Sequence, residues 1–132
     1  MNKVNIIKEI DNINKFLQSE LWFDFEVKEY TKNRLCIIGS IDPTYPPNIK
    51  IHFKDIFFLS LPIEWKTDTS KKILSLVEGE DAININKQFQ VEQGYYLFQF
   101  KAEYYPDDFK CLIGAKEISY TLVGPSRKPS VF

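Results

Sequence analysis

The chain has 132 residues, the usual size of one domain and enough to bury a core without disulfides or metals. Hydrophobic residues make up 44% and aromatic residues 15%, while 17 basic and 18 acidic side chains leave a net charge of −1. This balance excludes the strong positive field typical of generic nucleic-acid or anionic-membrane binding. We therefore expect one globular domain over residues 1–123, a C-terminal tail over residues 124–132, and neither nucleic acid nor membrane as a partner.

The two cysteines, Cys36 and Cys111, lie far apart, each within an apolar run. Free buried thiols are one interpretation, and a disulfide is the alternative if the two strands pair side by side. The N-terminus has no uninterrupted apolar segment of a secretory signal, and no apolar run approaches the ~18 residues that span a bilayer. These features predict a protein of the reducing cytoplasm.

Residues 3–19 have the spacing of an amphipathic helix. Their apolar positions step by four, three and four residues, at Ile6, Ile10, Ile13 and Leu17. The opposite side is polar, so we expect this helix to pack on the core with one side in water.

From residue 21 the period changes to two, which predicts a half-buried strand. The apolar positions are Leu21, Phe23, Phe25 and Val27. Asp24 and Glu26 share the other face with Trp22, and their separation along the strand is about 6.5 to 7 Å. They are interpreted as a solvated face, as a recognition face, or as a general acid–base pair acting through a water.

The pattern in the middle of the chain predicts two further strands, a proline-rich loop and a polar surface segment. Residues 35–41 are apolar on both sides, which favours a central strand, and the loop 42–48 contains three prolines that would hold Tyr45 in a stiff display. A third strand from Ile49 continues past a bulge or turn at Asp55 into a more deeply buried run. Residues 62–72 are polar and predict a surface excursion that exposes Trp65.

The second half is less uniform. Residues 73–77 predict a short strand or helical turn, and residues 80–89 favour a helix over a strand. Residues 95–105 alternate over their whole length and predict one long aromatic strand, followed by a hairpin connection at 106–108. The last strand, 111–122, has a predicted bend or bulge at Gly114. Together these elements predict an α+β fold in which the N-terminal helix packs on a strongly twisted, mainly antiparallel sheet or partly open barrel.

The sequence lacks the residue patterns of common metal-binding, catalytic and nucleotide-binding sites. His52 is the only histidine, and it lies between Lys50 and Lys54 on the polar face of a strand, where the two cations disfavour its protonation and exposure is expected. No zinc-ligand spacing, nucleophile elbow, P-loop or dinucleotide fingerprint occurs in the sequence. We expect no metal, no cofactor and no catalytic activity.

Four short segments follow one another in the order found in a family of small proteins. They are Trp22–Val27, Asn33–Leu35, Phe53–Ile56 and the closing strand that bears Cys111. In this order the chain resembles the small bacterial immunity proteins of polymorphic toxin systems over most of residues 21–122. Related openings often place a histidine before the aspartate that Asp24 matches, and this chain has Phe23 there. The resemblance implies a compact, non-enzymatic protein that neutralises a toxin by binding it, and it assigns no contact residue.

The sequence thus predicts a non-catalytic protein-binding module, with a toxin as the expected partner. Exposed aromatics and carboxylates are the candidate contacts, namely Trp22, Asp24, Glu26, Tyr45 and Trp65. One alternative is a small-ligand domain with an aromatic-lined pocket, and another is a hydrolase that uses Asp24 and Glu26. Homodimerisation by edge-strand pairing is compatible with so β-rich a chain.

Overall fold

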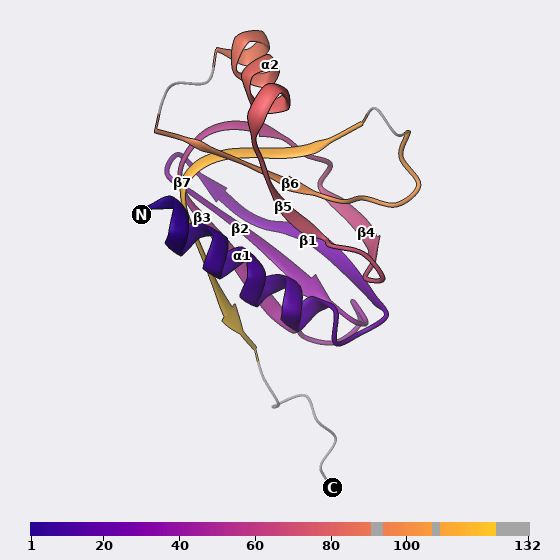
Figure 1. Cartoon of the computed structure of the whole chain (residues 1–132). Coiled ribbons are helices and arrows are strands. Elements are labelled where there is room, and N and C mark those ends of the chain that lie inside the picture. Colours follow the sequence, from indigo (N-terminus) through magenta and orange to yellow (C-terminus); the bar gives the residue numbers. More distant parts are fainter. Residues whose placement is uncertain (91–93, 107–108, 124–132) are drawn as a thin grey trace, which may run out of the picture.

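A computed structural model describes residues 1–90, 94–106 and 109–123 of the chain (Figure 1). Two helices and seven strands follow in the order α1 Lys3–Leu17, β1 Trp22–Thr31, β2 Arg34–Ser40, β3 Ile49–Ser60, β4 Glu64–Asp68, β5 Leu74–Val77, α2 Gly79–Phe89, β6 Tyr96–Phe100 and β7 Cys111–Leu122. The predicted hairpin connection at 106–108 and the predicted tail at 124–132 fall wholly or partly outside the described residues.

The seven strands form one antiparallel sheet in the order β4-β1-β2-β3-β7-β6-β5. The sheet curls strongly into a half-barrel, and α1 packs on it (Figure 1). This architecture confirms the predicted α+β class. The helix at 79–89 is also confirmed. It lies at one end of the sheet (Figure 1), where its N-cap residue Glu78 forms an ion pair with Lys3, the first residue of α1.

The first helix forms where the apolar spacing predicts it. The side chain of Asn2 caps its start by accepting a hydrogen bond from the Asn5 amide at 2.9 Å. The apolar stripe buries Ile6, Ile10, Ile13 and Leu17, each at most 2% exposed. The concave face of the sheet is therefore filled by aliphatic side chains from α1.

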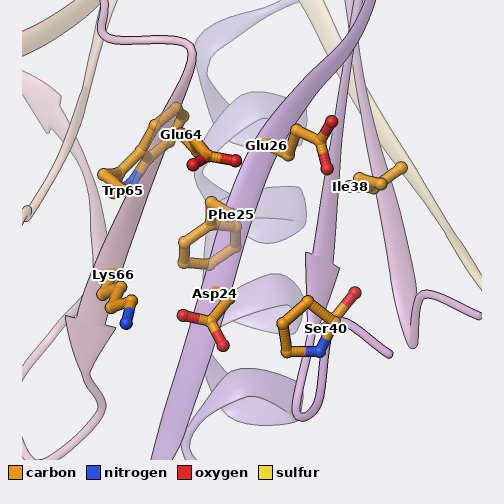
Figure 2. Close-up of a pocket in the computed structure, with 9 residues that line it drawn as sticks. Asp24, Phe25, Glu26, Ile38, Ser40, Glu64, Trp65 and Lys66 are labelled. Atoms are coloured by element: carbon orange, nitrogen blue, oxygen red, sulfur yellow. The ribbon is translucent and has the colours of Figure 1, made fainter. Parts of the chain in front are cut away.

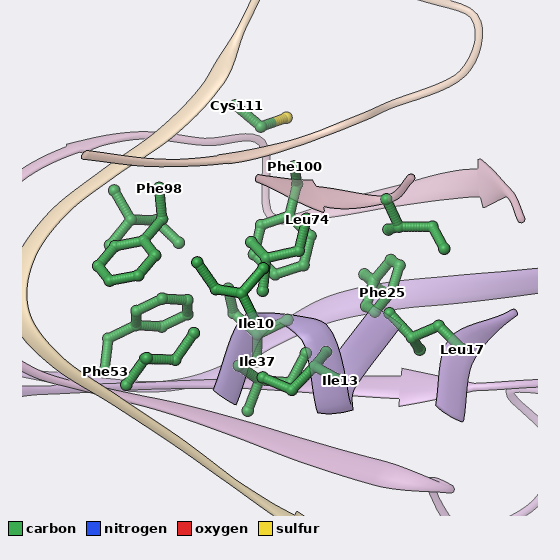
Figure 3. Close-up of a cluster of buried hydrophobic side chains, with 14 of the residues drawn as sticks. Ile10, Ile13, Leu17, Phe25, Ile37, Phe53, Leu74, Phe98, Phe100 and Cys111 are labelled. Atoms are coloured by element: carbon green, nitrogen blue, oxygen red, sulfur yellow. The ribbon is translucent and has the colours of Figure 1, made fainter. Parts of the chain in front are cut away.

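Aromatic rings from the sheet complete this core (Figure 3). The Phe53 and Phe98 ring centroids lie 5.1 Å apart, and Phe25 lies 5.3 Å from Phe100. These spacings are those of favourable tilted and edge-to-face pairs. The rings that would line an internal ligand pocket thus pack against one another.

Two expectations about burial are wrong. Trp65 belongs to β4 and is 3% exposed, because Trp65 and Thr67 both point into the core from a strand that pairs with β1. Leu21 is 89% exposed because β1 begins one residue later, so only Phe23 and Phe25 of that stretch are fully buried.

The bulge predicted near Asp55 is confirmed. Asp55 has a φ of 57°, and the pairing of β3 with β7 shifts register between Ile56 and Phe58. The extra residue, Phe57, lies in β3. Gly114 of β7 is paired with the next residue, Phe58, and gives it room, since a Cβ on Gly114 would come within 3.2 Å of the Phe58 Cβ. Beyond the bulge β3 is half-buried, so the more deeply buried run expected there is wrong.

Both cysteines are free thiols, as expected from one of the two interpretations. β3 lies between β2 and β7, which keeps Cys36 away from Cys111. Burial raises the pKa of the Cys111 thiol to about 11.

The long strand expected at 95–105 ends at Phe100. Beyond it the chain turns across the gap between the two edges of the curled sheet. The Lys101 amide donates to the carbonyl of Ile73, and the Glu103 amide donates to the carbonyl of Lys66 in β4. The hydroxyl of Thr67 donates to the Lys101 carbonyl. We call residues 101–103 the seam, because they join β4 to the start of β5 without forming a strand.

A buried amide fixes α1 against the other edge strand. Asn14 is 5% exposed and donates to the Leu74 carbonyl at 2.7 Å. Its oxygen accepts from the Ile73 and Leu74 amides at 3.2 and 2.9 Å. The side chain thereby satisfies backbone groups at the edge where β5 has no further strand beside it.

Replacing this amide should be costly. Asn14→Ala leaves three buried backbone groups without their partners, so we expect the free energy of unfolding to fall by about 2 to 4 kcal/mol. Urea denaturation measures this loss. Asn12→Ala, on the partly exposed side of the same helix, is the matched control, and equal effects in the two variants would contradict the role of Asn14.

Candidate functional site

The outer face of the sheet, opposite α1, carries the carboxylates predicted as contacts. Asp24 and Glu26 project from β1 on this face, and β4 brings two charged neighbours into register with them (Figure 2). Asp24 lies opposite Lys66, and Glu26 lies opposite Glu64. Three acids and one base therefore converge on two adjacent strands.

A shallow groove of about 180 Å³ runs between these side chains. Ser40 and Ile38 of β2 and Pro43 of the following loop form its other wall. We call this feature the acidic groove. Lys66 is the one cation among the described residues that line it, so the charge of its three acids is only partly compensated.

One carboxylate atom in the groove lacks a partner. The Oδ1 atom of Asp24 is buried and accepts no hydrogen bond from the described residues. A buried carboxylate oxygen without a donor costs folding free energy, and native proteins almost always supply one from protein or water. The Asp24 Oδ1 atom can therefore accept a hydrogen bond from a donor outside the described residues.

Aromatic residues flank the groove. Trp22 contacts Tyr104 with ring centroids 6.4 Å apart, and Tyr104 is 87% exposed with a φ of 68°. Tyr45 belongs to the loop whose Pro43 lines the groove, and it is 63% exposed. Its loop is ordered by Asp42, whose carboxylate accepts hydrogen bonds from the amide and hydroxyl of Thr44, and these hydrogen bonds lower the pKa of Asp42.

The structure brings some of the predicted contact residues together on the outer face and buries another. Trp22, Asp24 and Glu26 share the outer face, and Tyr45 belongs to the loop whose Pro43 lines the groove. Trp65 also lines the groove, together with Phe25, whose ring centroid lies 5.6 Å from its own. It is not an exposed contact, because it is 3% exposed and belongs to the core.

Three residues of this surface were missed from sequence, namely Glu64, Lys66 and Tyr104. The signal for the first two was present in the alternation of Glu64-Trp65-Lys66-Thr67-Asp68, which has the period of a strand. Tyr104 could not have been found, since alternation continues through the residue where β6 stops.

A second charged depression lies farther along the same outer face. Lys28, Arg34, Lys50 and Lys54 surround Cys36 and His52, with Glu29 as the acid that lines it, in a volume of about 290 Å³. We call this feature the basic pocket. Cys36 and His52 are directly opposite each other on β2 and β3.

The surroundings of the basic pocket shift the pKa values of His52 and Cys36. Burial lowers the pKa of His52, and Arg34, Lys50 and Lys54 lower it further, which confirms the predicted effect of cationic neighbours. His52 is half-buried, not exposed as expected. Burial raises the pKa of the Cys36 thiol, so the thiol stays neutral near pH 7 and offsets none of the surrounding charge.

Within residues 1–90, 94–106 and 109–123, no cluster of three or more histidine, cysteine or acidic side chains has the geometry to hold a metal ion. In the same part of the chain, no helix is both long and apolar enough to cross a bilayer.

A scan against protein-family models, a search of curated proteins and a search of solved structures found no match to this chain. The candidate sites are therefore defined by their own geometry and charge.

His52 generates a pH prediction. The pKa of His52 is lower in the folded chain than in the unfolded chain. As the pH falls, the unfolded chain therefore binds more protons than the folded chain, and the free energy of unfolding should fall with the pH. Between about pH 7.5 and about pH 5.5 we expect the free energy of unfolding of the wild type to fall more steeply than that of His52→Gln. Denaturation in a phosphate-free buffer measures both slopes, and parallel slopes would contradict the assignment.

Proposed function

We propose that this protein is a non-catalytic binding module that recognises a protein partner through the acidic groove. The observation that carries the proposal is the convergence of Asp24, Glu26 and Glu64 around a depression in which no described residue donates a hydrogen bond to the Asp24 Oδ1 atom. A lysine or arginine side chain of a partner supplies that donor and the missing positive charge in one group.

The surroundings of the groove favour a macromolecular partner. Its volume of about 180 Å³ is below the range of roughly 300 to 1,000 Å³ that small-molecule pockets occupy, but it suits one inserted side chain. Two exposed tyrosines belong to the neighbouring segments, namely Tyr104, which contacts Trp22, and Tyr45 in the loop of Pro43. Tyrosine is frequent among residues that dominate binding energy.

The resemblance of Trp22–Val27 and the segments after it to small immunity proteins supports a more specific partner. We propose that the partner is a toxin, neutralised by stoichiometric binding. A basic patch on that toxin would face the acidic groove, and the opposite charges would speed association as well as orient the complex.

The test is affinity capture from the native host followed by native mass spectrometry. Wild-type protein should carry one protein partner at fixed stoichiometry. The triple variant Asp24→Asn/Glu26→Gln/Glu64→Gln should bind the purified partner at least about tenfold more weakly, because three charges that face the partner are lost. Cells that express the partner should grow when the wild-type protein is co-expressed. They should not grow when the triple variant is co-expressed.

A matched control is available in Asp11→Asn/Glu20→Gln/Glu80→Gln, which removes the same charge from exposed positions outside the groove. It should bind as the wild type does. Equal weakening in both triple variants would show a general charge effect and contradict the groove. A partner that does not inhibit growth would contradict the toxin while leaving the groove in place.

A further inference from the structure

The basic pocket is a concentration of like charge within one face of a chain that is nearly neutral. Lys28 comes from β1, Arg34 from β2, and Lys50 and Lys54 from β3, so three strands contribute to one depression. Lys54 lies directly opposite Arg34 in the register. Like charges at directly paired positions of a sheet destabilise it, and hence folding alone does not account for their gathering.

These cations are not neutralised by the described chain. None of the four has a carboxylate within salt-bridge distance among the described residues. Glu29 lines the pocket and Glu117 of β7 lies opposite Lys54 of β3, so these two acids offset only part of the charge of the four cations. The neutral thiol of Cys36 adds no negative charge. The pocket thus presents uncompensated positive charge around two half-buried groups, Cys36 and His52.

We propose that the basic pocket binds a small soluble oxyanion of the phosphate class, such as pyrophosphate or the terminal phosphates of a phosphate ester. The guanidinium of Arg34 has the planar fork that matches two phosphate oxygens, and the three lysines supply mobile point charges around it. The imidazole N–H of His52 is a further donor on the floor of the pocket.

Size and surroundings select this ligand class. A volume of about 290 Å³ lies at the lower limit for small-ligand sites and suits one or two phosphate groups. Phe53 is the one Phe, Tyr or Trp among the described residues of the lining, and it is 0% exposed on the opposite face. Among the described residues the pocket therefore has no exposed Phe, Tyr or Trp ring of the kind that forms a stacking platform, which argues against single-stranded nucleic acid.

The test is a titration of the full-length protein with pyrophosphate at constant ionic strength, followed by ¹H–¹⁵N correlation spectra. Saturable shifts should be confined to the strands β1, β2 and β3 around the pocket. Arg34→Gln and Lys50→Gln should each weaken binding about tenfold, since each removes a charge-assisted contact. Lys66→Gln, which removes the same charge from the acidic groove, should leave the affinity unchanged.

Folding does not obscure this test, because the three substituted side chains are exposed and the loss of Arg34 relieves its repulsion with Lys54. Shifts that stay linear in pyrophosphate, or that Lys66→Gln changes as much as Arg34→Gln does, would overturn the site. Saturable binding of a hexaglutamate peptide with no binding of pyrophosphate would also overturn it and assign the pocket to an acidic protein segment.

Discussion

The hydrogen bonds of Asn14 fix α1 against β5, and the rest of the architecture follows from that position. One side-chain amide gives the edge of β5 the donor and acceptor that a further strand would give. With α1 held in the concave face, Phe25, Phe53 and their neighbours close around its aliphatic stripe. A sheet that curls around a helix in this way turns its polar positions outward, so the convex face becomes the surface available for recognition.

That convex face is divided by charge. Glu26 belongs to the acidic groove and Lys28 to the basic pocket, although only one residue separates them along β1. The bulge in β1 between Val27 and Glu29 lies at this boundary and shifts the later residues of the strand relative to β2. The nearly balanced net charge of the chain therefore conceals two surfaces of opposite sign. Each surface is suited to a ligand of the other sign, and the two lie on the same side of the molecule.

Much of this fold follows from local patterns. The helix at the N-terminus, the central position of β2 and the irregularity at Asp55 are encoded in the spacing of a few residues. The errors share a cause, since alternation does not reveal where pairing stops. Trp65 joins the core because β1 pairs with β4, and Tyr104 leaves the strand because the chain turns at Lys101. For the same reason, sequence identified the acids of β1 but not Glu64, whose place depends on a long-range register.

The seam at residues 101–103 serves the core and the outer surface at once. It connects β4 to Ile73 inside the fold, and its next residue, Tyr104, contacts Trp22 beside the acidic groove. A short irregular segment opens more readily than the strands that it joins. A core substitution that loosens the seam would therefore displace Tyr104 while the sheet was still intact. In a population of such variants, the recognition proposed for the acidic groove would be lost before the fold is lost. A measurement of stability alone would then overestimate how many variants still bind.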